Sequence, residues 1–190
     1  MLNRRHLRIK VLQLLYAFYQ SEEDNFPKAE KELLLTIERM YDMYLYLLLS
    51  LPELKRAAEN KLSDKKKKIR PSEDDLHPNR KFVDNQLIEI LENSTNLNSL
   101  CNKRKVNWMG VENQELFRKI WQHTLENETY FAFMNNDVSG FDEDRAFILS
   151  VFKDDVANSS LLYNFFEEKS INWLDDLDLC CSMVLKSLKG

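Results

Sequence analysis

Glycine, proline and cysteine are scarce in this chain of 190 residues, which contains three Gly, four Pro and three Cys. Because sheets and their hairpins need turn residues, so few Gly and Pro exclude a protein rich in β-structure and favour helices throughout. The three cysteines, Cys101, Cys180 and Cys181, are odd in number and contain no Cys-x-x-Cys pair. They therefore exclude a disulfide framework and a cysteine metal site, and they favour a reducing compartment.

Motifs of catalysis and of metal binding are also missing. The sequence contains no Gly-rich phosphate loop, no Gly-x-Ser-x-Gly elbow and no His-Glu-x-x-His pattern. The segment Asp175-Asp176-x-Asp178 resembles a Mg²⁺-binding cluster, but acidic residues in the first turn of a helix complement its dipole, and we favour that explanation. We predict a protein that is not an enzyme, with no catalytic residue, no metal ligand and no cofactor.

Charge is distributed unevenly along the chain. With 44% hydrophobic and 31% charged residues, the composition is typical of a globular protein, and the formal net charge is −4. Residues 137–190 hold eleven acidic and five basic side chains, whereas no acidic residue precedes Glu22. Such a chain is expected to bind an anion at its basic start and a basic partner at its acidic end.

The first turns of the chain are the most informative part of the sequence. They carry the side chains Arg4, Arg5, His6, Arg8 and Lys10. These groups crowd the N-terminal end of a predicted helix, where the dipole is already positive and acidic residues are normally favoured. The mismatch costs about 0.3–1 kcal/mol per exposed charge, so we expect an anionic partner, with phosphate as the first candidate. A solvated basic terminus without a ligand is the alternative.

The same predicted helix is amphipathic. Apolar residues recur at steps of three and four and are expected to face a core: Leu7, Val11, Leu14, Leu15 and Phe18. The two flanks of this stripe differ, one carrying Arg5, Arg8, Tyr16 and Tyr19 and the other His6, Lys10 and Gln13. An arginine-rich amphipathic start also resembles a mitochondrial transit peptide, but no Ser occurs before Ser21, so we favour a retained helix.

Four segments are predicted from the order of apolar runs and charged breaks. They are the basic first helix with further apolar helices (1–63), a charged loop (64–78), and two helical units (79–134 and 135–190). The loop contains four consecutive lysines, Lys65 to Lys68. A run of like charge is typical of a solvated loop, and contact with nucleic acid is its less favoured interpretation.

A dense apolar run extends from Lys28 to Leu51 within the first segment. It is expected to end at Pro52, after which a short helix restarts. Glu38, Arg39 and Asp42 interrupt the run, and each charge at a bilayer centre would cost about 2.5–3.5 kcal/mol. The run is therefore interpreted as a helix buried in a bundle rather than as a membrane span.

An internal repeat relates the last two segments. Residues 79–108 align without a gap on residues 144–173, with identities at Arg80/Arg145, Phe82/Phe147, Asn93/Asn158, Ser94/Ser159, Leu97/Leu162, Asn107/Asn172 and Trp108/Trp173. Asn-Ser at the same place in both copies predicts a helix end followed by an N-cap. We favour the repeated tryptophan as a packing anchor over a binding platform. The predicted fold class is an all-α helical bundle with a two-copy, three-helix repeat.

The segment Arg4-Arg5-His6-Leu7-Arg8, followed by Leu12-Gln13-x-Leu15-Tyr16, resembles the start of the transcription antitermination factor NusB family. That family opens with Arg-Arg-x-x-Arg running into an apolar helix. The Tyr- and Leu-rich run, the lysine loop and the Asn-Trp-x-Asp-Asp-Leu-Asp segment are similar to its long form found in Bacteroidetes. The family ends in a further helical bundle, and this sequence stops at Gly190 before such a segment, as a truncated chain or a shortened homologue would.

The resemblance implies a cytoplasmic, NusB-like helical protein that binds the boxA element of single-stranded transcripts from ribosomal RNA operons. It implies the ribosomal protein NusE and the transcription elongation complex as partners. Arg4, Arg5 and Arg8 match the family's arginine-rich motif and Tyr16 its tyrosine, while His6 and Lys10 complete the predicted RNA-binding set. Two alternatives are a non-catalytic helical interaction module and the NusB-like regulatory domain of a ribosomal RNA methyltransferase.

Overall fold

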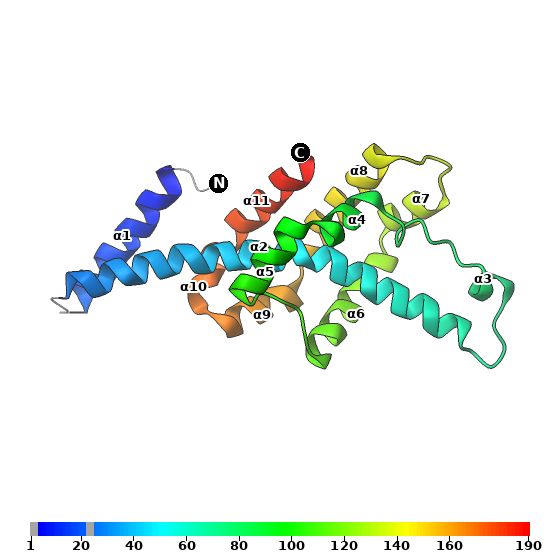
Figure 1. Cartoon of the computed structure of the whole chain (residues 1–190), viewed down its shortest axis with the longest axis horizontal. Helices are drawn as coiled ribbons and strands as arrows, with labels where there is room; N and C mark the ends of the chain where they lie inside the picture. Colours follow the sequence, from blue (N-terminus) through cyan, green and yellow to red (C-terminus); the bar gives the residue numbers. More distant parts are fainter. Residues whose placement is uncertain (1–3, 22–24) are drawn as a thin grey trace.

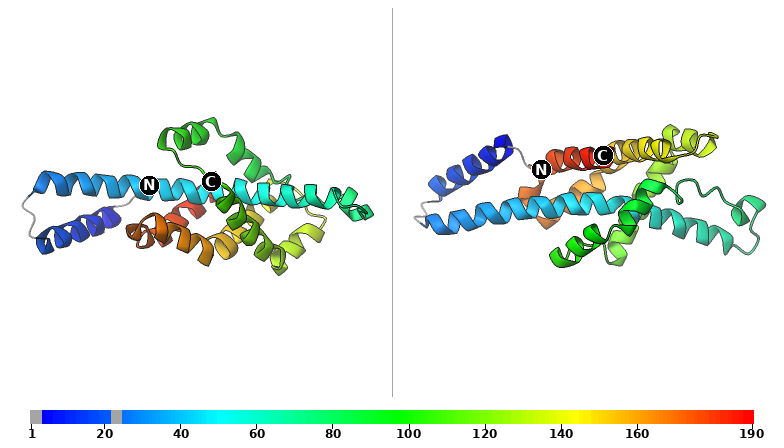
Figure 2. Two further views of the ribbon diagram at one scale, coloured as in Figure 1. Left: turned by 90° about the horizontal axis from the view of Figure 1, so that it is seen from below. Right: turned by 45° about the horizontal axis from the view of Figure 1, so that its top comes forward.

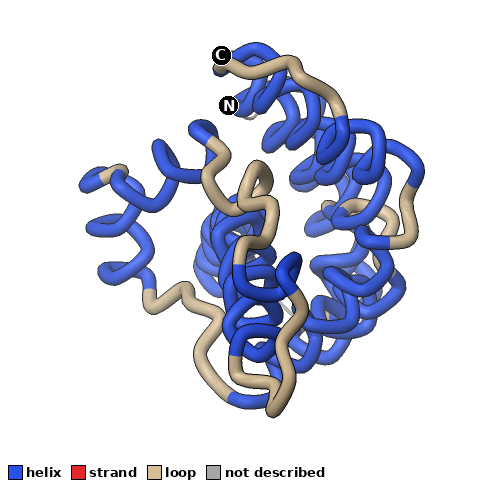
Figure 3. The backbone as a smooth tube through the Cα atoms, turned by 90° about the vertical axis from the view of Figure 1, so that its right-hand side faces the viewer, coloured by secondary structure: helices blue, strands red, loops and turns tan. Residues whose placement is uncertain are grey.

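The computed structural model describes residues 4–21 and 25–190, and within these ranges the chain forms helices and no strand (Figure 1). The elements are α1 (Arg4–Gln20), α2 (Phe26–Lys66), α3 (Glu73–Leu76), α4 (Gln86–Asn93), α5 (Thr95–Arg104), α6 (Val111–Leu125), α7 (Glu128–Asn135), α8 (Phe141–Val151), the π-helical turn η1 (Phe152–Val156), α9 (Ser160–Lys169), α10 (Ile171–Leu174) and α11 (Leu177–Lys189). The predicted all-α class is confirmed, and Figure 3, viewed along the long axis, shows only helices and loops.

The long helix α2 forms the axis of the molecule. It spans 41 residues and begins after Asn25, whose side chain accepts a hydrogen bond from the backbone nitrogen of Lys28. Figures 1 and 2 show α1 beside the first part of α2, while the later helices gather around the middle and the second part. The core therefore surrounds only part of α2.

Helix α2 continues through Pro52, so the expected break at this residue is wrong. A proline inside a helix removes one backbone hydrogen bond and costs about 3 kcal/mol. On both sides of it, the side chains of Leu47, Leu48, Leu51 and Leu54 are buried. Burial of one such side chain contributes about 1.5–3 kcal/mol, so the packing of several leucines outweighs the cost of the proline.

The predicted charged loop of residues 64–78 is shorter than expected and contains a helix. The axis helix α2 extends to Lys66, so the lysine run begins inside it. The one-turn helix α3 is capped by Ser72, whose Oγ accepts a hydrogen bond from the Asp75 nitrogen while Asp75 Oδ2 accepts one from the Ser72 nitrogen. Hydrogen bonds from Lys68 Nζ and from Ser72 hold the pKa of Asp75 below its usual value.

Tyr46 of α2 lies at the centre of an aromatic core. Its ring contacts those of Trp108, Phe165, Phe166 and Trp173 at centroid distances of 5.0, 5.9, 6.5 and 6.1 Å. Trp108 Nε1 also donates a hydrogen bond to the carbonyl oxygen of Tyr46 at 3.0 Å. The two tryptophans have only 3% and 7% of their surface exposed, so their predicted role as packing anchors is confirmed.

The two copies of the repeat begin their second helices with equivalent serine caps. Ser94 Oγ accepts a hydrogen bond from the Leu97 nitrogen at 3.3 Å at the start of α5. Ser159 Oγ accepts one from the Leu162 nitrogen at 3.4 Å at the start of α9. The predicted N-caps are therefore confirmed in both copies.

The first helices of the two copies differ. In the first copy, α4 starts after Asn85, a buried cap that accepts hydrogen bonds from the nitrogens of Leu87 and Ile88. In the second copy, α8 starts earlier along the repeat, at Phe141, and continues directly into η1. Asn85 Nδ2 donates to the carbonyl oxygen of Asp144 at 3.2 Å, which ties the start of α4 to α8.

Candidate nucleic-acid interface

Helix α1 presents three arginines to solvent at its N-terminal end. Arg4, Arg5 and Arg8 are exposed, and the first turn of α1 contains no acidic residue. Within residues 4–21 and 25–190, none of the three forms an ion pair with a carboxylate. Their charges therefore add to the positive end of the helix dipole, and no carboxylate of the described residues offsets them.

Most other arginines of the chain are paired with an acidic residue. The pairs are Arg56–Glu53 at 2.8 Å, Arg80–Asp84 at 3.1 Å, Arg118–Glu115 at 2.6 Å, Arg145–Asp142 at 2.8 Å, and Arg104–Asp42. Four of these five pairs join residues that are three or four positions apart on a helix. An arginine of this chain usually has an acidic neighbour one turn away, and the arginines of α1 do not.

Aromatic side chains share the exposed face of α1 with the arginines. Tyr16 and Tyr19 have 68% and 80% of their surface exposed. Tyr16 follows Arg5 by eleven residues, and Tyr19 follows Arg8 by the same interval, which is about three helical turns. Each tyrosine thus lies on the same side of the helix as an arginine, an arrangement suited to a strand of phosphates and bases.

Lys10, predicted to contact RNA, instead points away from the exposed arginines. Its side chain is buried, and its Nζ lies 2.7 Å from Asp176 Oδ1, with 8% and 6% of the two side chains exposed. A cation held in a buried ion pair is not available to a phosphate, so the prediction for Lys10 is corrected. His6 is half-buried and lines the same cavity as Lys10 and Asp176, on the flank opposite the arginines.

Asp176 has a role that sequence reasoning missed. The sequence predicts that the acidic cluster begins a helix, and Asp178 does lie in the first turn of α11, but the Asp176 side chain makes no capping hydrogen bond. Burial raises the pKa of Asp176, while the hydrogen bond and the charge of Lys10 act in the opposite direction. Because the two partners are 166 positions apart in the chain, no local spacing could have revealed their contact.

The predicted apolar stripe of α1 is covered only in part. Leu7 and Val11 keep 37% and 40% of their surface exposed, whereas Leu14, Leu15 and Phe18 are half-buried. The expectation that the whole stripe faces a core is therefore wrong. The physical reason is that α1 packs mainly against α2, and one neighbouring helix covers only one side of the stripe.

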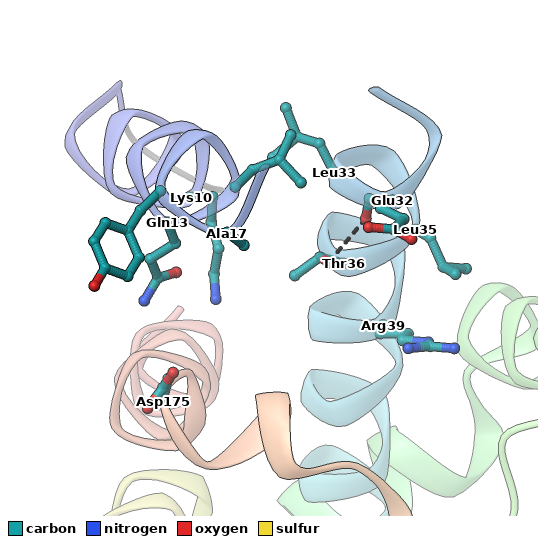
Figure 4. Close-up of a pocket in the computed structure, with 11 residues that line it drawn as sticks. Lys10, Gln13, Ala17, Glu32, Leu33, Leu35, Thr36, Arg39 and Asp175 are labelled. Carbon is teal, nitrogen blue, oxygen red and sulfur yellow. Dashed lines mark hydrogen bonds between the residues drawn. The ribbon is translucent and has the colours of Figure 1, made fainter. Parts of the chain in front are cut away.

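A cleft of about 640 Å³ opens between α1, α2 and the link from α10 to α11 (Figure 4). In Figure 4, Lys10 and Gln13 extend from α1 toward the corner that carries Asp175, and α2 contributes Thr36 and Arg39. Arg39 is exposed and forms no ion pair within the described ranges. The sequence identified Arg39 only as a charge that argues against a membrane span, and its place in the lining of this cleft was not predicted.

The lysine run of residues 65–68 lies far from these arginines. Figure 1 places it at the end of α2 opposite to α1. Lys68 is engaged by Asp75 at 3.0 Å. The structure therefore does not bring the two basic segments of the sequence together into one surface.

Comparisons with known proteins provide no relative for this arrangement: the chain matches no protein-family model, no curated protein and no solved structure. Among the residues that the structure describes, no group of three His, Cys, Asp or Glu side chains could hold a metal ion. In residues 4–21 and 25–190, no helix is both long and apolar enough to cross a membrane. The exposed surface of α1 is therefore the feature from which a function can be inferred.

Proposed function

We propose that this protein is a NusB-like transcription antitermination factor that binds single-stranded, boxA-like RNA of ribosomal RNA operons through α1. The observation that carries the proposal is that Arg4, Arg5 and Arg8, at the N-terminal end of that helix, are exposed and form no ion pair within residues 4–21 and 25–190. The protein acts in the cytoplasm and has no catalytic role of its own.

Phosphate groups supply the negative charge that the start of α1 lacks. Guanidinium groups hold phosphate oxygens with paired hydrogen bonds, and a helix N-terminus adds its own favourable dipole. Single-stranded RNA also offers unstacked bases, which aromatic side chains such as Tyr16 and Tyr19 can cover. A double helix would keep its bases stacked, so the exposed tyrosines favour a single strand.

Exposed apolar residues on α1 support a protein partner beside the RNA. Leu7, Val11 and Leu12 keep 37%, 40% and 68% of their surface exposed, and contiguous apolar surface commonly marks an interaction site. We propose the ribosomal protein NusE and the transcription elongation complex, the partners that the resemblance of the N-terminal segment implies. A helical interaction module without RNA binding is the second candidate, because the same apolar residues would serve it.

Fluorescence anisotropy with a labelled boxA-like RNA tests the proposal against this second candidate. The variant Arg4→Ala/Arg5→Ala/Arg8→Ala should bind at least about tenfold more weakly than the unmodified chain, since each lost arginine removes a phosphate contact. The matched control, Arg56→Ala/Arg80→Ala/Arg118→Ala, removes the same net charge at three exposed arginines that lie outside α1. It should bind within about threefold of the unmodified chain.

Two results would contradict the proposal. If both triple variants lost affinity equally, the RNA would be attracted by net charge and not by α1. If the unmodified chain did not bind the RNA at all, the interaction module would be the better description.

A further inference from the structure

A second cleft, of about 500 Å³, lies between α2 and α5. Leu45 and Leu48 of α2 are buried beneath it. The other lining residues are exposed or half-buried: Tyr41, Tyr44, Asn96, Leu97, Ser99, Leu100 and Lys103. A concave site lined mainly by apolar and aromatic side chains, with a few polar groups among them, is typical of a binding site.

Fixed contacts between α2 and α5 define the walls of this cleft. Arg104, in the last turn of α5, donates a hydrogen bond to the Asp42 carboxylate and another, at 3.0 Å, to the carbonyl oxygen of Glu38. Its guanidinium lies 5.4 Å from the centre of the Tyr41 ring, which stacks on the Tyr44 ring at a centroid distance of 5.8 Å. Because these contacts hold the end of α5 and both rings in place, a ligand need not order the walls when it binds.

The polar groups at the cleft are few, and most have no partner within residues 4–21 and 25–190. Four lining side chains form neither a hydrogen bond nor an ion pair there: Tyr41, Asn96, Ser99 and Lys103. The Tyr44 hydroxyl, in contrast, is hydrogen-bonded to that of Ser187 at 2.9 Å. No carboxylate belongs to the described lining, and Lys103 carries its one charge. The cleft can therefore offer hydrogen bonds and a single positive charge beside apolar surface.

The α5 side of the cleft is positively charged. From the end of α4 to the start of α6 the chain contains no acidic residue. Arg104 is offset by two carboxylates of α2, those of Asp42 and Glu38. Lys103 and Lys105 form no ion pair in the described parts of the chain. Their charges favour a partner with acidic groups on this side.

The shape and lining of the cleft restrict the partner further. Both sides are helices, so neither offers a strand edge to which an extended peptide could pair its backbone. An amphipathic helix, in contrast, places side chains at i, i+4 and i+7 into an apolar groove. RNA fits this cleft less well, because the affinity of nucleic acid depends on several cations that face phosphates, and the described lining has only Lys103.

We propose that this cleft is a docking surface for an acidic amphipathic helix of a partner protein. The apolar side chains of that helix contact Leu97, Leu100 and the two tyrosines, and its acidic side chains lie beside Lys103. Charge complementarity with the acid-free α5 side is the reason for this choice of partner. The surface shares no residue with α1, so the proposal does not depend on RNA binding.

The probe is an acetylated and amidated helical peptide with leucines at i, i+4 and i+7 and glutamates along one flank. It is titrated into the full ¹⁵N-labelled chain and followed by NMR. The amides of residues 96–103 and those of Tyr41 and Tyr44 should shift along one saturable curve. A control peptide with lysine in place of each glutamate should bind at least about tenfold more weakly, because Lys103 then faces like charge. A second control, with serine in place of each leucine, should give no saturable shift.

Variants locate the site. Ser99→Trp places a large ring at the cleft and should weaken binding of the acidic peptide at least about tenfold, whereas Asn102→Trp, at an exposed position of α5 outside the lining, should change it by less than about twofold. Lys103→Glu should weaken binding of the acidic peptide and strengthen that of the lysine peptide, and Lys119→Glu, at an exposed lysine of α6, should do neither. Circular dichroism establishes that the variants fold, and the comparison of peptides on the unmodified chain decides the question even if a variant does not.

Four outcomes would overturn the proposal. Equal binding of the lysine peptide would make the cleft an apolar groove with no preference for an acidic partner. If a boxA-like RNA shifted the same amides and displaced the peptide, the cleft would belong to an RNA surface. If these amides shifted when the chain alone was concentrated, the occupant would be a second copy of the chain. Shifts unaffected by Ser99→Trp would place the peptide elsewhere.

Discussion

Two regions of this molecule are rich in apolar residues but differ in how they are covered. We call residues 4–21 and 25–39 the arm, and residues 40–190 the body. In the arm, only Lys10 and Ala29 are buried. Nine large apolar or aromatic side chains of the arm are exposed: Leu7, Ile9, Val11, Leu12, Tyr16, Tyr19, Phe26, Leu34 and Leu35.

The body also exposes some large apolar side chains, but unlike the arm it buries many others in a core. Its aromatic rings surround Tyr46, and five of its arginines are paired with acidic residues. Apolar periodicity therefore predicts that a segment is helical, but it does not predict how much of the apolar face is buried. Burial depends on how many other elements pack against the helix. Arginines without an ion pair among the described residues lie together with exposed tyrosines in the arm, and this coincidence is the reason for placing the proposed RNA binding there.

The largest expected effect is on the body. Trp108→Ala should lower the free energy of unfolding by about 3–5 kcal/mol, because it removes a buried ring and the hydrogen bond to the Tyr46 carbonyl. Tyr19→Ala, in the arm, should change it by less than about 0.5 kcal/mol. Urea denaturation measures the free energy of unfolding of both variants. Equal losses in the two variants would contradict the difference in burial between the arm and the body.

The ion pair that fastens the arm to the body should have the next largest effect. Lys10→Met leaves the buried Asp176 carboxylate without its lysine partner, which should destabilise the docked position of α1 by about 3 kcal/mol. Hydrogen exchange should then accelerate at the α1 amides and stay unchanged at those of α6. The double variant Lys10→Met/Asp176→Leu removes both charges and should restore slow exchange; persistent fast exchange would assign the docking to other contacts.

The pH dependence of this docking has a definite sign. Because burial raises the pKa of Asp176, the folded state holds its proton more tightly than the unfolded chain does. The stability that this group contributes is present below the ordinary aspartate pKa and is lost as the pH rises through the raised value. The exchange of α1 amides in Lys10→Met should therefore slow as the pH is lowered, after correction for the intrinsic rate, and Asp176→Asn should abolish this dependence.

A smaller effect is expected at the exposed face of the arm. Tyr16→Ala should weaken RNA binding by about 1–3 kcal/mol if a base stacks on this ring, and Tyr16→Phe should retain most of the affinity. Anisotropy titrations of both variants give the comparison. A loss in the phenylalanine variant as large as in the alanine variant would mean that the hydroxyl, rather than the ring, makes the contact.

The smallest effect concerns the link between α2 and α4. Asp75 accepts hydrogen bonds from Lys68 and from the Ser72 nitrogen, and these lower its pKa. Its contribution to stability is present above the ordinary aspartate pKa and is lost as the pH falls through the lowered value. Asp75→Asn should therefore slightly reduce the loss of unfolding free energy at acid pH, whereas Asp137→Asn should not change it. Urea denaturation at several pH values measures this dependence. The same pH dependence in both variants would contradict a stabilising role of the Asp75 cap.

Sequence reasoning succeeded where the cause is local. Ser94 and Ser159 cap helices through bonds to residues three positions later, so a repeated Asn-Ser pattern is enough to predict them. It failed where the cause is packing: Pro52 lies inside α2 because neighbouring leucines are buried, and Lys10 is buried because Asp176 approaches it from the far end of the chain. Of the predicted RNA-binding residues, the structure leaves the arginines and Tyr16 exposed.

The salt dependence of RNA binding tests the central claim most directly, because it counts the phosphates that the arm engages. For a single strand, the slope of log affinity against log salt concentration falls by about 0.7 for each lost phosphate contact. The magnitude of this negative slope should therefore fall by about 2 in Arg4→Ala/Arg5→Ala/Arg8→Ala. It should stay unchanged in Arg56→Ala/Arg80→Ala/Arg118→Ala. A slope that stays the same in the first variant, or that falls equally in both, would contradict the assignment of the RNA to α1.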